Sequence, residues 1–188
     1  ILHQCKKYGN YDMVYEFAST SKITFPGDGV ACMATSEANL EDFEKWIGIQ
    51  TISYDKVNQQ RHVLYLQNHA HTLKLKKHAA FMAPKFEAVL STLDREIAPL
   101  EIASWSHPKG GYFISFDAMP GTAKRTLALC KEAGVSMTAA GATFPYGIDP
   151  NDSNIRIAPS FPPVEDVEKA ITVFCTCVRM AALEKLGV

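Results

Sequence analysis

The apolar positions of the chain follow several spacings, and each spacing predicts a different kind of element. Two short apolar runs, 13–18 and 30–34, are bounded by turn residues and predict short buried strands. In the segment that follows, apolar residues lie three and four apart, which predicts a helix capped by Thr35 or Ser36. A second helix is predicted over 54–68.

A long helix is predicted from about residue 71 to residue 97. Its apolar positions recur at three- and four-residue steps: Leu75, Ala79, Met82, Phe86, Val89, Leu90 and Leu93. Pro84 falls inside this pattern and is expected to kink or split the helix, because proline lacks the backbone N–H that a helix interior needs. A helix of this length is typical of a connection between two domains.

Beyond Pro99 the pattern changes to short strands and shorter helices. The predicted order is two strands joined by a turn at 108–111, a helix ending at Gly134, strands over 135–144 and 155–161, and a last helix starting at 162–163. The fold class is therefore α/β, with a first part over 1–75, a connecting helix over 76–98 and a small α+β domain over 99–188.

Composition narrows the functional classes. Of the 188 residues 47% are hydrophobic and 21% charged, which predicts a packed core, and the net charge of -1 argues against a nucleic-acid partner. No apolar run is long enough to span a membrane. Five irregularly spaced cysteines indicate free thiols in a reducing cytoplasm. His69, His71 and His78 lack a second group of ligands, so no metal site is predicted.

Lys22 is the residue whose surroundings suggest chemistry. It lies in the hydroxyl-rich stretch "STSKITFPG", between the two apolar runs predicted as buried strands. Burial would favour the neutral amine, which is the form that makes a Schiff base with an aldehyde. The hydroxyls of Ser19 and Ser21 could bind phosphate oxygens, and Gly27 and Gly29 allow close approach of the backbone. A Schiff-base lysine beside a phosphate cradle is what pyridoxal 5'-phosphate requires.

Two further segments carry candidate binding residues. Arg156 alternates with Ile155 and Ile157, so it faces away from the core if the isoleucines face inward, and a guanidinium there could grip a carboxylate. A solvated arginine on an edge strand is the alternative. Gly110, in "HPKGGYFISF", precedes an aromatic strand and indicates either a close approach to the backbone or an ordinary hairpin turn.

Taken in order, these pieces resemble the C-terminal half of a class I/II aminotransferase, a pyridoxal-phosphate enzyme of fold type I. "STSKITFPG" resembles the family's lysine segment, "PKGGYFISF" the strand that opens its small domain, "NIRIAPSF" the stretch with its carboxylate-binding arginine, and the tail from "VEDVEKA" onward its final helix. The variant with "STSKITFPG" is similar to a bacterial subgroup of aspartate aminotransferases. The resemblance makes residues 1–75 the C-terminal part of the cofactor-binding large domain.

The resemblance implies roles residue by residue. Lys22 would carry the cofactor and move the substrate's proton, while Ser19 and Ser21 would touch the phosphate. Arg156 would hold the substrate carboxylate, with Gly110 and Asn154 beside it. Tyr146 would lie near the same site. Arg61 is a candidate for the second cation that a dicarboxylate needs, with a solvated arginine on a helix as the favoured alternative.

The sequence departs from the family pattern in two ways. Many members carry a phosphate-binding arginine seven or eight residues after the lysine, where this chain has Gly29 and Val30. Only 21 residues precede Lys22, so the family's upstream Gly-rich loop, stacking aromatic residue and ring-nitrogen aspartate would lie outside this chain. The expectation is a C-terminal portion of a transaminase that is inactive, or nearly so, by itself.

The expected activity is transfer of an amino group from an amino acid, aspartate or glutamate, to a 2-oxo acid by a cytoplasmic homodimer. Three alternatives stay open: another fold type I reaction such as β-elimination, the aminotransferase-like effector domain of a transcription regulator, and a non-enzymatic interaction domain. The regulator would need a basic helix-turn-helix, which this sequence does not contain.

Overall fold

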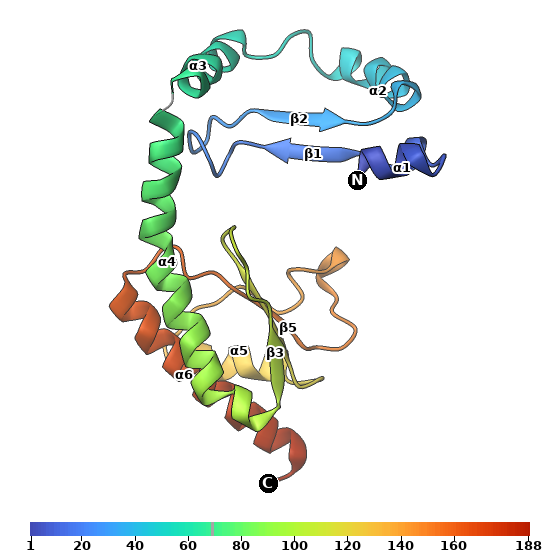
Figure 1. The fold of residues 1–188 in the computed structure, drawn as a ribbon. Coiled ribbons are helices and arrows are strands. Elements are labelled where there is room, and N and C mark those ends of the chain that lie inside the picture. The colour runs from blue at the N-terminus through green and yellow to red at the C-terminus, as the bar shows by residue number, and fades with distance from the viewer. Residues whose placement is uncertain (69) are drawn as a thin grey trace. The chain divides into compact units, whose positions relative to one another are not determined.

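The computed structural model describes residues 1–68 and 70–188, with the side chains of 70–73 excepted. The described residues form two compact units, Ile1–Lys77 (unit 1) and His78–Val188 (unit 2), shown as ribbons in Figure 1. The fold is mixed helix and strand, as the hydrophobic pattern predicts. None of the described helices combines the length and the apolar composition that a bilayer span requires.

Unit 1 is a β-hairpin with helices around it. Strands β1 (Glu16–Ser19) and β2 (Ala31–Ala34) pair antiparallel, with Phe17 opposite Met33. The described helices of the unit are α1 (Leu2–Lys7), a short 3-10 helix (Tyr11–Met13), α2 (Glu37–Gln50), α3 (Lys56–Gln67) and the start of α4. Ser36 caps α2 by accepting the amide hydrogen of Asn39, and Asp55 caps α3 by accepting that of Asn58, so both predicted helices are confirmed.

The expectation that the two strands are buried is wrong for this chain. Every residue of β1 and β2 is at least partly exposed, and Phe17 is 74% exposed. Within the described part of unit 1 the buried side chains are all polar: Thr24, Thr35, Ser36 and His62. The apolar runs therefore predicted the strands correctly, but a two-stranded sheet has too little neighbouring structure to cover both of its faces.

Helix α4 (Ala70–Glu96) confirms the predicted long helix. Pro84 lies inside it without ending it, so the expected split into two helices is not found. The residues of α4 up to Lys77 belong to unit 1 and those from His78 belong to unit 2.

Unit 2 is built on an antiparallel sheet in the order β3-β4-β5, with β3 at Ala103–Trp105, β4 at Ile114–Ala118 and β5 at Asn154–Ile157. Its other elements are two short 3-10 helices, Ala98–Leu100 and Pro145–Gly147, and the helices α5 (Ala123–Glu132) and α6 (Val164–Leu186). The turn before β4, the end of α5 near Gly134 and the start of α6 after Pro163 follow the prediction.

The strand predicted over 135–144 is not found. The Val135 amide closes the end of α5 on the Cys130 carbonyl, and the Ala142 and Phe144 amides bond to carbonyls three residues before them. Gly141 has a φ of 79°, which lies outside the strand region. Backbone donors used in local turns are not available to a strand ladder, so this segment is irregular.

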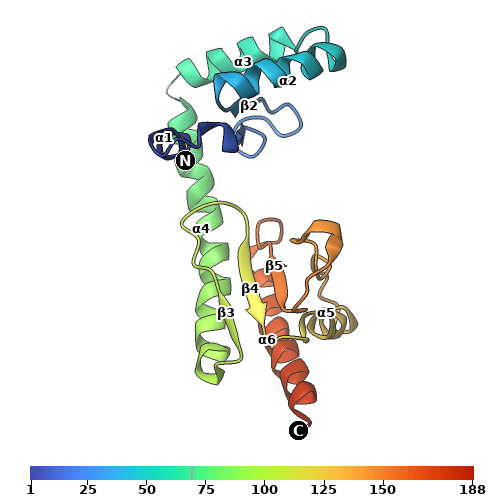
Figure 2. The ribbon, with the colours of Figure 1, turned by 90° about the vertical axis from the view of Figure 1, so that its right-hand side faces the viewer.

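The core of unit 2 lies on one face of the sheet, where α4, α5 and α6 pack (Figure 2). Phe116 of β4 stacks with Trp105 at 5.9 Å between ring centroids and meets the edge of Phe174 from α6 at 5.0 Å. Two of the chain's free cysteines, Cys130 and Cys175, are fully buried here, and burial raises the pKa of each thiol to about 12.

Candidate active site

Lys22 lies in the loop that joins β1 to β2. The loop starts as a tight turn, because the Ile23 and Thr24 amides both donate to the Thr20 carbonyl. The Lys22 side chain is exposed. The burial invoked above to explain a neutral amine is therefore not found in this chain, for the same reason that the strands are exposed.

Ser19 and Ser21, three residues and one residue before the lysine, form a pair of exposed hydroxyls. Ser19 Oγ and Ser21 Oγ are 2.7 Å apart, and the Ser21 amide donates to Ser19 Oγ at 3.1 Å. Gly29 approaches this pair so closely that a Cβ there would lie 2.8 Å from the Ser21 Cα and would overlap its hydroxyl. Any side chain at this position, an arginine included, would have to displace the Ser21 segment. The approach predicted for Gly29 is that of the backbone to an anion, and it stays a prediction.

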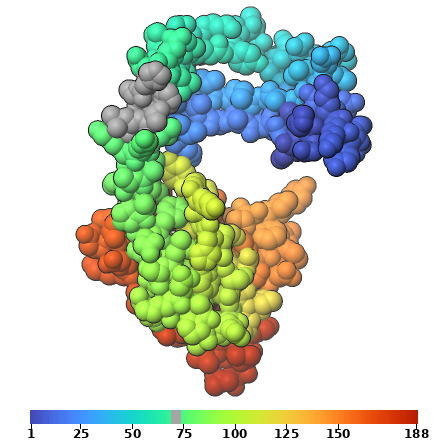
Figure 3. Space-filling model, in the orientation of Figure 1, coloured from blue at the N-terminus to red at the C-terminus, as the bar shows by residue number. Residues whose placement is uncertain are grey.

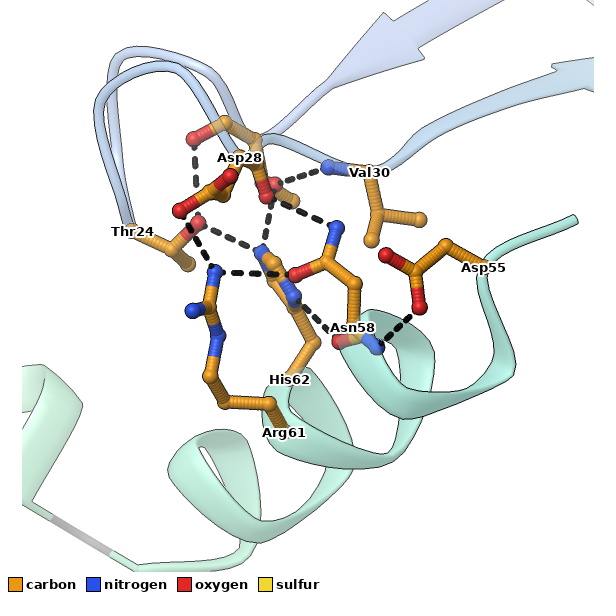
Figure 4. Close-up of polar contacts among 8 residues, drawn as sticks. Thr24, Asp28, Val30, Asp55, Asn58, Arg61 and His62 are labelled. Carbon is orange, nitrogen blue, oxygen red and sulfur yellow. Dashed lines mark hydrogen bonds and ion pairs between the residues drawn. The ribbon is translucent and has the colours of Figure 1, made fainter.

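Helix α3 holds the other side of the loop (Figure 4). Arg61 forms an ion pair with Asp28 at 3.0 Å and lies over the Phe25 ring at 4.4 Å, and Asn58 Nδ2 donates to the Asp28 carbonyl. His62 Nε2 lies within hydrogen-bond distance of the Thr24 hydroxyl. Arg61, considered above as a second cation for a dicarboxylate, is thus paired with a carboxylate of the loop itself.

Arg156 lies on the face of the unit 2 sheet opposite the core. Ile155 and Ile157 are buried, so the alternation predicted for β5 is confirmed. The Arg156 guanidinium stacks over the Phe113 ring at 4.5 Å, and Nη2 donates weakly to Thr138 Oγ1 at 3.4 Å. Its buried Nε has no acceptor among the described residues. The guanidinium is therefore oriented by a ring and keeps donor capacity for a carboxylate.

Asn154 shares this face, since it lies two residues before Arg156 on β5. Its side-chain amide donates to Ser115 Oγ and Asp117 Oδ1 and accepts from Thr143 Oγ1. These partners occupy its amide hydrogens, so the structure gives Asn154 a role in joining β5 to β4 and to the preceding loop.

The loop between α5 and β5 stands out from unit 2 as the orange segment of Figure 3. Asp149 anchors its base by accepting the amide hydrogens of Asn154, Ser153 and Asn151. These bonds, the one from Asn154 first, lower the pKa of the Asp149 carboxyl. Tyr146 within this loop is 98% exposed and has a φ of 58°, in the left-handed region.

Gly110 lies in the loop between β3 and β4. A Cβ at Gly110 would meet open space, whereas the φ of 88° at Gly111 is the feature that calls for glycine. Tyr112 follows and hydrogen-bonds to His78 at 2.8 Å. His69 and the side chain of His71, named with His78 in the metal argument, lie outside the described residues.

The predicted residues thus fall into two groups that the structure describes separately. Ser19, Ser21 and Lys22 come together in unit 1, and Arg156, Asn154 and Gly110 belong to unit 2. Sequence reasoning missed the partners of each group. His62 lies 38 residues from Thr24, and no periodicity in the sequence signals that contact. Phe113 belongs to the segment "PKGGYFISF" singled out in the sequence, but nothing in that segment indicates that its ring packs against Arg156.

Comparison with known families gives a match over the whole chain. Residues 1–188 match the family model described as aspartate amino-transferase. The chain is 47% identical over 179 residues to a protein of Mycolicibacterium smegmatis whose name places it among the aminotransferases. It is 46% identical over 178 residues to a protein of Corynebacterium glutamicum named aspartate aminotransferase. These alignments cover 95% and 94% of this chain but 42% and 41% of the relatives.

Solved structures give the same result. A crystal structure of an aspartate transaminase from Corynebacterium glutamicum superposes with a TM-score of 0.89 at 43% identity, covering 98% of this chain and 44% of that one. An α-aminoadipate aminotransferase from Thermus thermophilus, solved with a phosphopyridoxyl-leucine complex, gives a TM-score of 0.72 at 20% identity, over 95% of this chain and 45% of that one. The latter likeness establishes the fold alone.

Proposed function

The chain belongs to the aspartate aminotransferase family, and we propose that it carries the lysine and the carboxylate-binding arginine of a pyridoxal-phosphate-dependent aminotransferase. The observation that carries the proposal is the arrangement of the β1–β2 loop. Lys22 follows a pair of hydroxyls 2.7 Å apart, beside a glycine where a Cβ would overlap Ser21.

The residues of this loop fit the cofactor. Lys22 lies at the exposed surface of the loop, and the Ser19 and Ser21 hydroxyls beside it are donors of the kind that bind phosphate oxygens. The Gly29 backbone packs directly against Ser21, which holds the end of the loop beside the serine pair. Lys22 would hold the cofactor through its amine, and the two serines would bind its phosphate.

When bound, pyridoxal phosphate supplies an electron-withdrawing ring that makes the α-hydrogen of an amino acid acidic. Once the substrate's amino group has displaced Lys22 from the cofactor, the released Lys22 amine would take the proton from the substrate Cα and later return it, acting as a general base and acid at Nζ. Arg156 would orient the substrate by two parallel hydrogen bonds to its carboxylate, a geometry that Phe113 supports by fixing the plane of the guanidinium.

The substrates proposed are an amino acid, aspartate or glutamate, and a 2-oxo acid. The name of the Corynebacterium glutamicum relative supports aspartate as the donor and transamination over β-elimination or an effector-binding role. Family membership is also what supports the expectation of a cytoplasmic homodimer without a nucleic-acid partner.

The proposal is tested by trapping the cofactor on the chain. We expect incubation with pyridoxal phosphate, borohydride reduction and peptide mapping to find the pyridoxyl label mainly on Lys22. Lys22→Arg should abolish that labelled peptide, while Lys45→Arg, a change at an exposed lysine of α2, should leave it unchanged. Preferential labelling of any other lysine, with Lys22 unmodified, would overturn the assignment.

A further inference from the structure

His62 is a buried histidine for which the proposed chemistry has no use. It is 4% exposed and is the one buried residue of α3, on a helix that is otherwise largely solvent-facing. A polar ring in such a place requires hydrogen-bond partners, because burying an unpaired polar group is costly. The partners that His62 has are what connect it to Lys22.

The ring nitrogens of His62 have distinct roles. Nδ1 lies 2.9 Å from the Asn58 carbonyl, which can only accept, so Nδ1 carries a hydrogen. In the neutral ring Nε2 is then the acceptor. It lies 2.8 Å from Thr24 Oγ1 and 3.2 Å from Thr20 Oγ1. Thr20 lies two residues before Lys22 and Thr24 two residues after it, so one imidazole nitrogen contacts a side-chain hydroxyl on each side of the lysine.

The same helix also fixes the returning limb of the loop (Figure 4). Thr20 Oγ1 accepts the amide hydrogen of Val30 at 2.9 Å, which ties the start of the loop to its end. Asp28 is held by the ion pair with Arg61 and, through its carbonyl, by Asn58. The Phe25 ring packs edge-on against His62 at 5.2 Å. Both limbs of the loop are thus attached to α3.

We propose that His62 is a positioning residue that fixes the loop on both sides of Lys22 and thereby sets where the lysine amine points. The inference rests on the proposed function, since it concerns the presentation of Lys22 to the cofactor. An exposed lysine on an unrestrained loop would sample many directions, and each reactive encounter would need the correct one. Restraining the backbone at Thr20 and Thr24 removes much of that freedom.

The test compares two substitutions of the same side chain in the full 188-residue chain. His62→Phe keeps a ring of similar size but removes both nitrogens, whereas His62→Gln keeps an acceptor within reach of the threonine hydroxyls. His78→Phe removes the histidine that bonds Tyr112 in unit 2 and serves as the control. Thr24→Val removes a bonding partner without changing the size of the side chain, and it replaces His62→Phe if that variant does not fold.

Two readouts are measured on each variant. The first is the pyridoxyl label trapped on Lys22, expressed relative to the label on all other lysines of the same sample. The second is amide hydrogen exchange over residues 20–30, which does not depend on the cofactor. We expect His62→Phe and Thr24→Val to lower the relative Lys22 label about tenfold, as loss of one well-made hydrogen bond implies, and to speed exchange in the loop. His62→Gln should recover most of the Lys22 label and most of the protection of the loop amides. His78→Phe should change neither the label nor the exchange.

The outcomes separate the two claims. Faster loop exchange with an unchanged relative Lys22 label would show a purely structural histidine and would overturn the inference, as would unchanged exchange. A wild-type chain that does not label at Lys22 overturns the proposed function instead. The loop exchange of the His62 variants then decides by itself whether the histidine holds the loop.

Discussion

Gly29 is the residue at which the lysine loop leaves no room for a side chain. A Cβ at this position would lie 2.8 and 2.9 Å from the backbone Cα and nitrogen of Ser21. Backbone atoms cannot move aside as a flexible side chain can, so any substitution must displace the loop. An arginine at Gly29 would therefore displace the loop, so phosphate binding would rest on hydroxyl and amide donors.

Gly29→Ala is expected to lower the free energy of unfolding of the loop by about 1–3 kcal/mol, the usual cost of overpacking, and to reduce the trapped label on Lys22. Gly48→Ala is the matched control, because a Cβ there meets open space within α2. Alanine in a helix interior should stabilise that variant by about 0.5–1 kcal/mol relative to glycine. Urea unfolding and peptide mapping of both variants provide the check, and equal behaviour of the two would contradict the steric argument.

At the scale of elements, the start of β5 depends on one carboxylate. Asp149 accepts three backbone amide hydrogens, and this bonding lowers its pKa in the folded chain below the value of about 3.9 for an unfolded aspartate. A group with a depressed folded pKa stabilises the fold above its unfolded pKa. That stabilisation is lost as the pH falls through the folded pKa.

Asp149→Asn should therefore destabilise unit 2 at pH 7 and flatten the fall in stability as the pH drops below about 4. Asparagine keeps one acceptor oxygen but replaces the other by a donor, so it cannot accept all three amides. Asp94→Asn, at an exposed position on α4, is the control and should leave the pH dependence unchanged. Thermal unfolding followed across this pH range decides between the two outcomes.

Most elements were predictable because their signals are local. The cap at Ser36, the stop near Gly134 and the alternation around Arg156 depend on neighbours within a few residues. The strand wrongly predicted over 135–144 was lost to local turns, whereas two other failures depend on distant structure. Whether an apolar strand such as β1 is buried is decided by what covers it, and the contact of His62 with Thr24 spans a loop and two elements. Periodicity carries no information on either.

At the scale of the whole molecule, the apolar core formed by the described side chains lies in unit 2. Every described hydrophobic side chain that is buried lies between Met82 and Ala182, whereas the buried side chains of unit 1 are polar. Burial of apolar surface is the main favourable term in folding. The two units should therefore differ in their free energies of opening.

Native-state hydrogen exchange on the whole chain should detect this difference. We expect the amides of β4, β5 and α6 to exchange only through global unfolding of unit 2, and those of β1 and β2 to exchange at least about 100-fold faster through local opening. Comparable protection in both hairpin strands and the unit 2 sheet would show that unit 1 has a source of stability other than a core.

The hairpin of unit 1 has a further consequence for the chain in solution. Both strands of a two-stranded sheet are edge strands. Along the outer edge of each strand, every second residue directs its N–H and C=O groups away from the partner strand. Exposed Phe17 stands on this ribbon, and Tyr15 comes just before it. Such an edge is a template for pairing with strands of other molecules, so concentrated samples should aggregate through this hairpin. The substitution Phe17→Lys should improve solubility, because a charged side chain on an edge strand opposes such pairing.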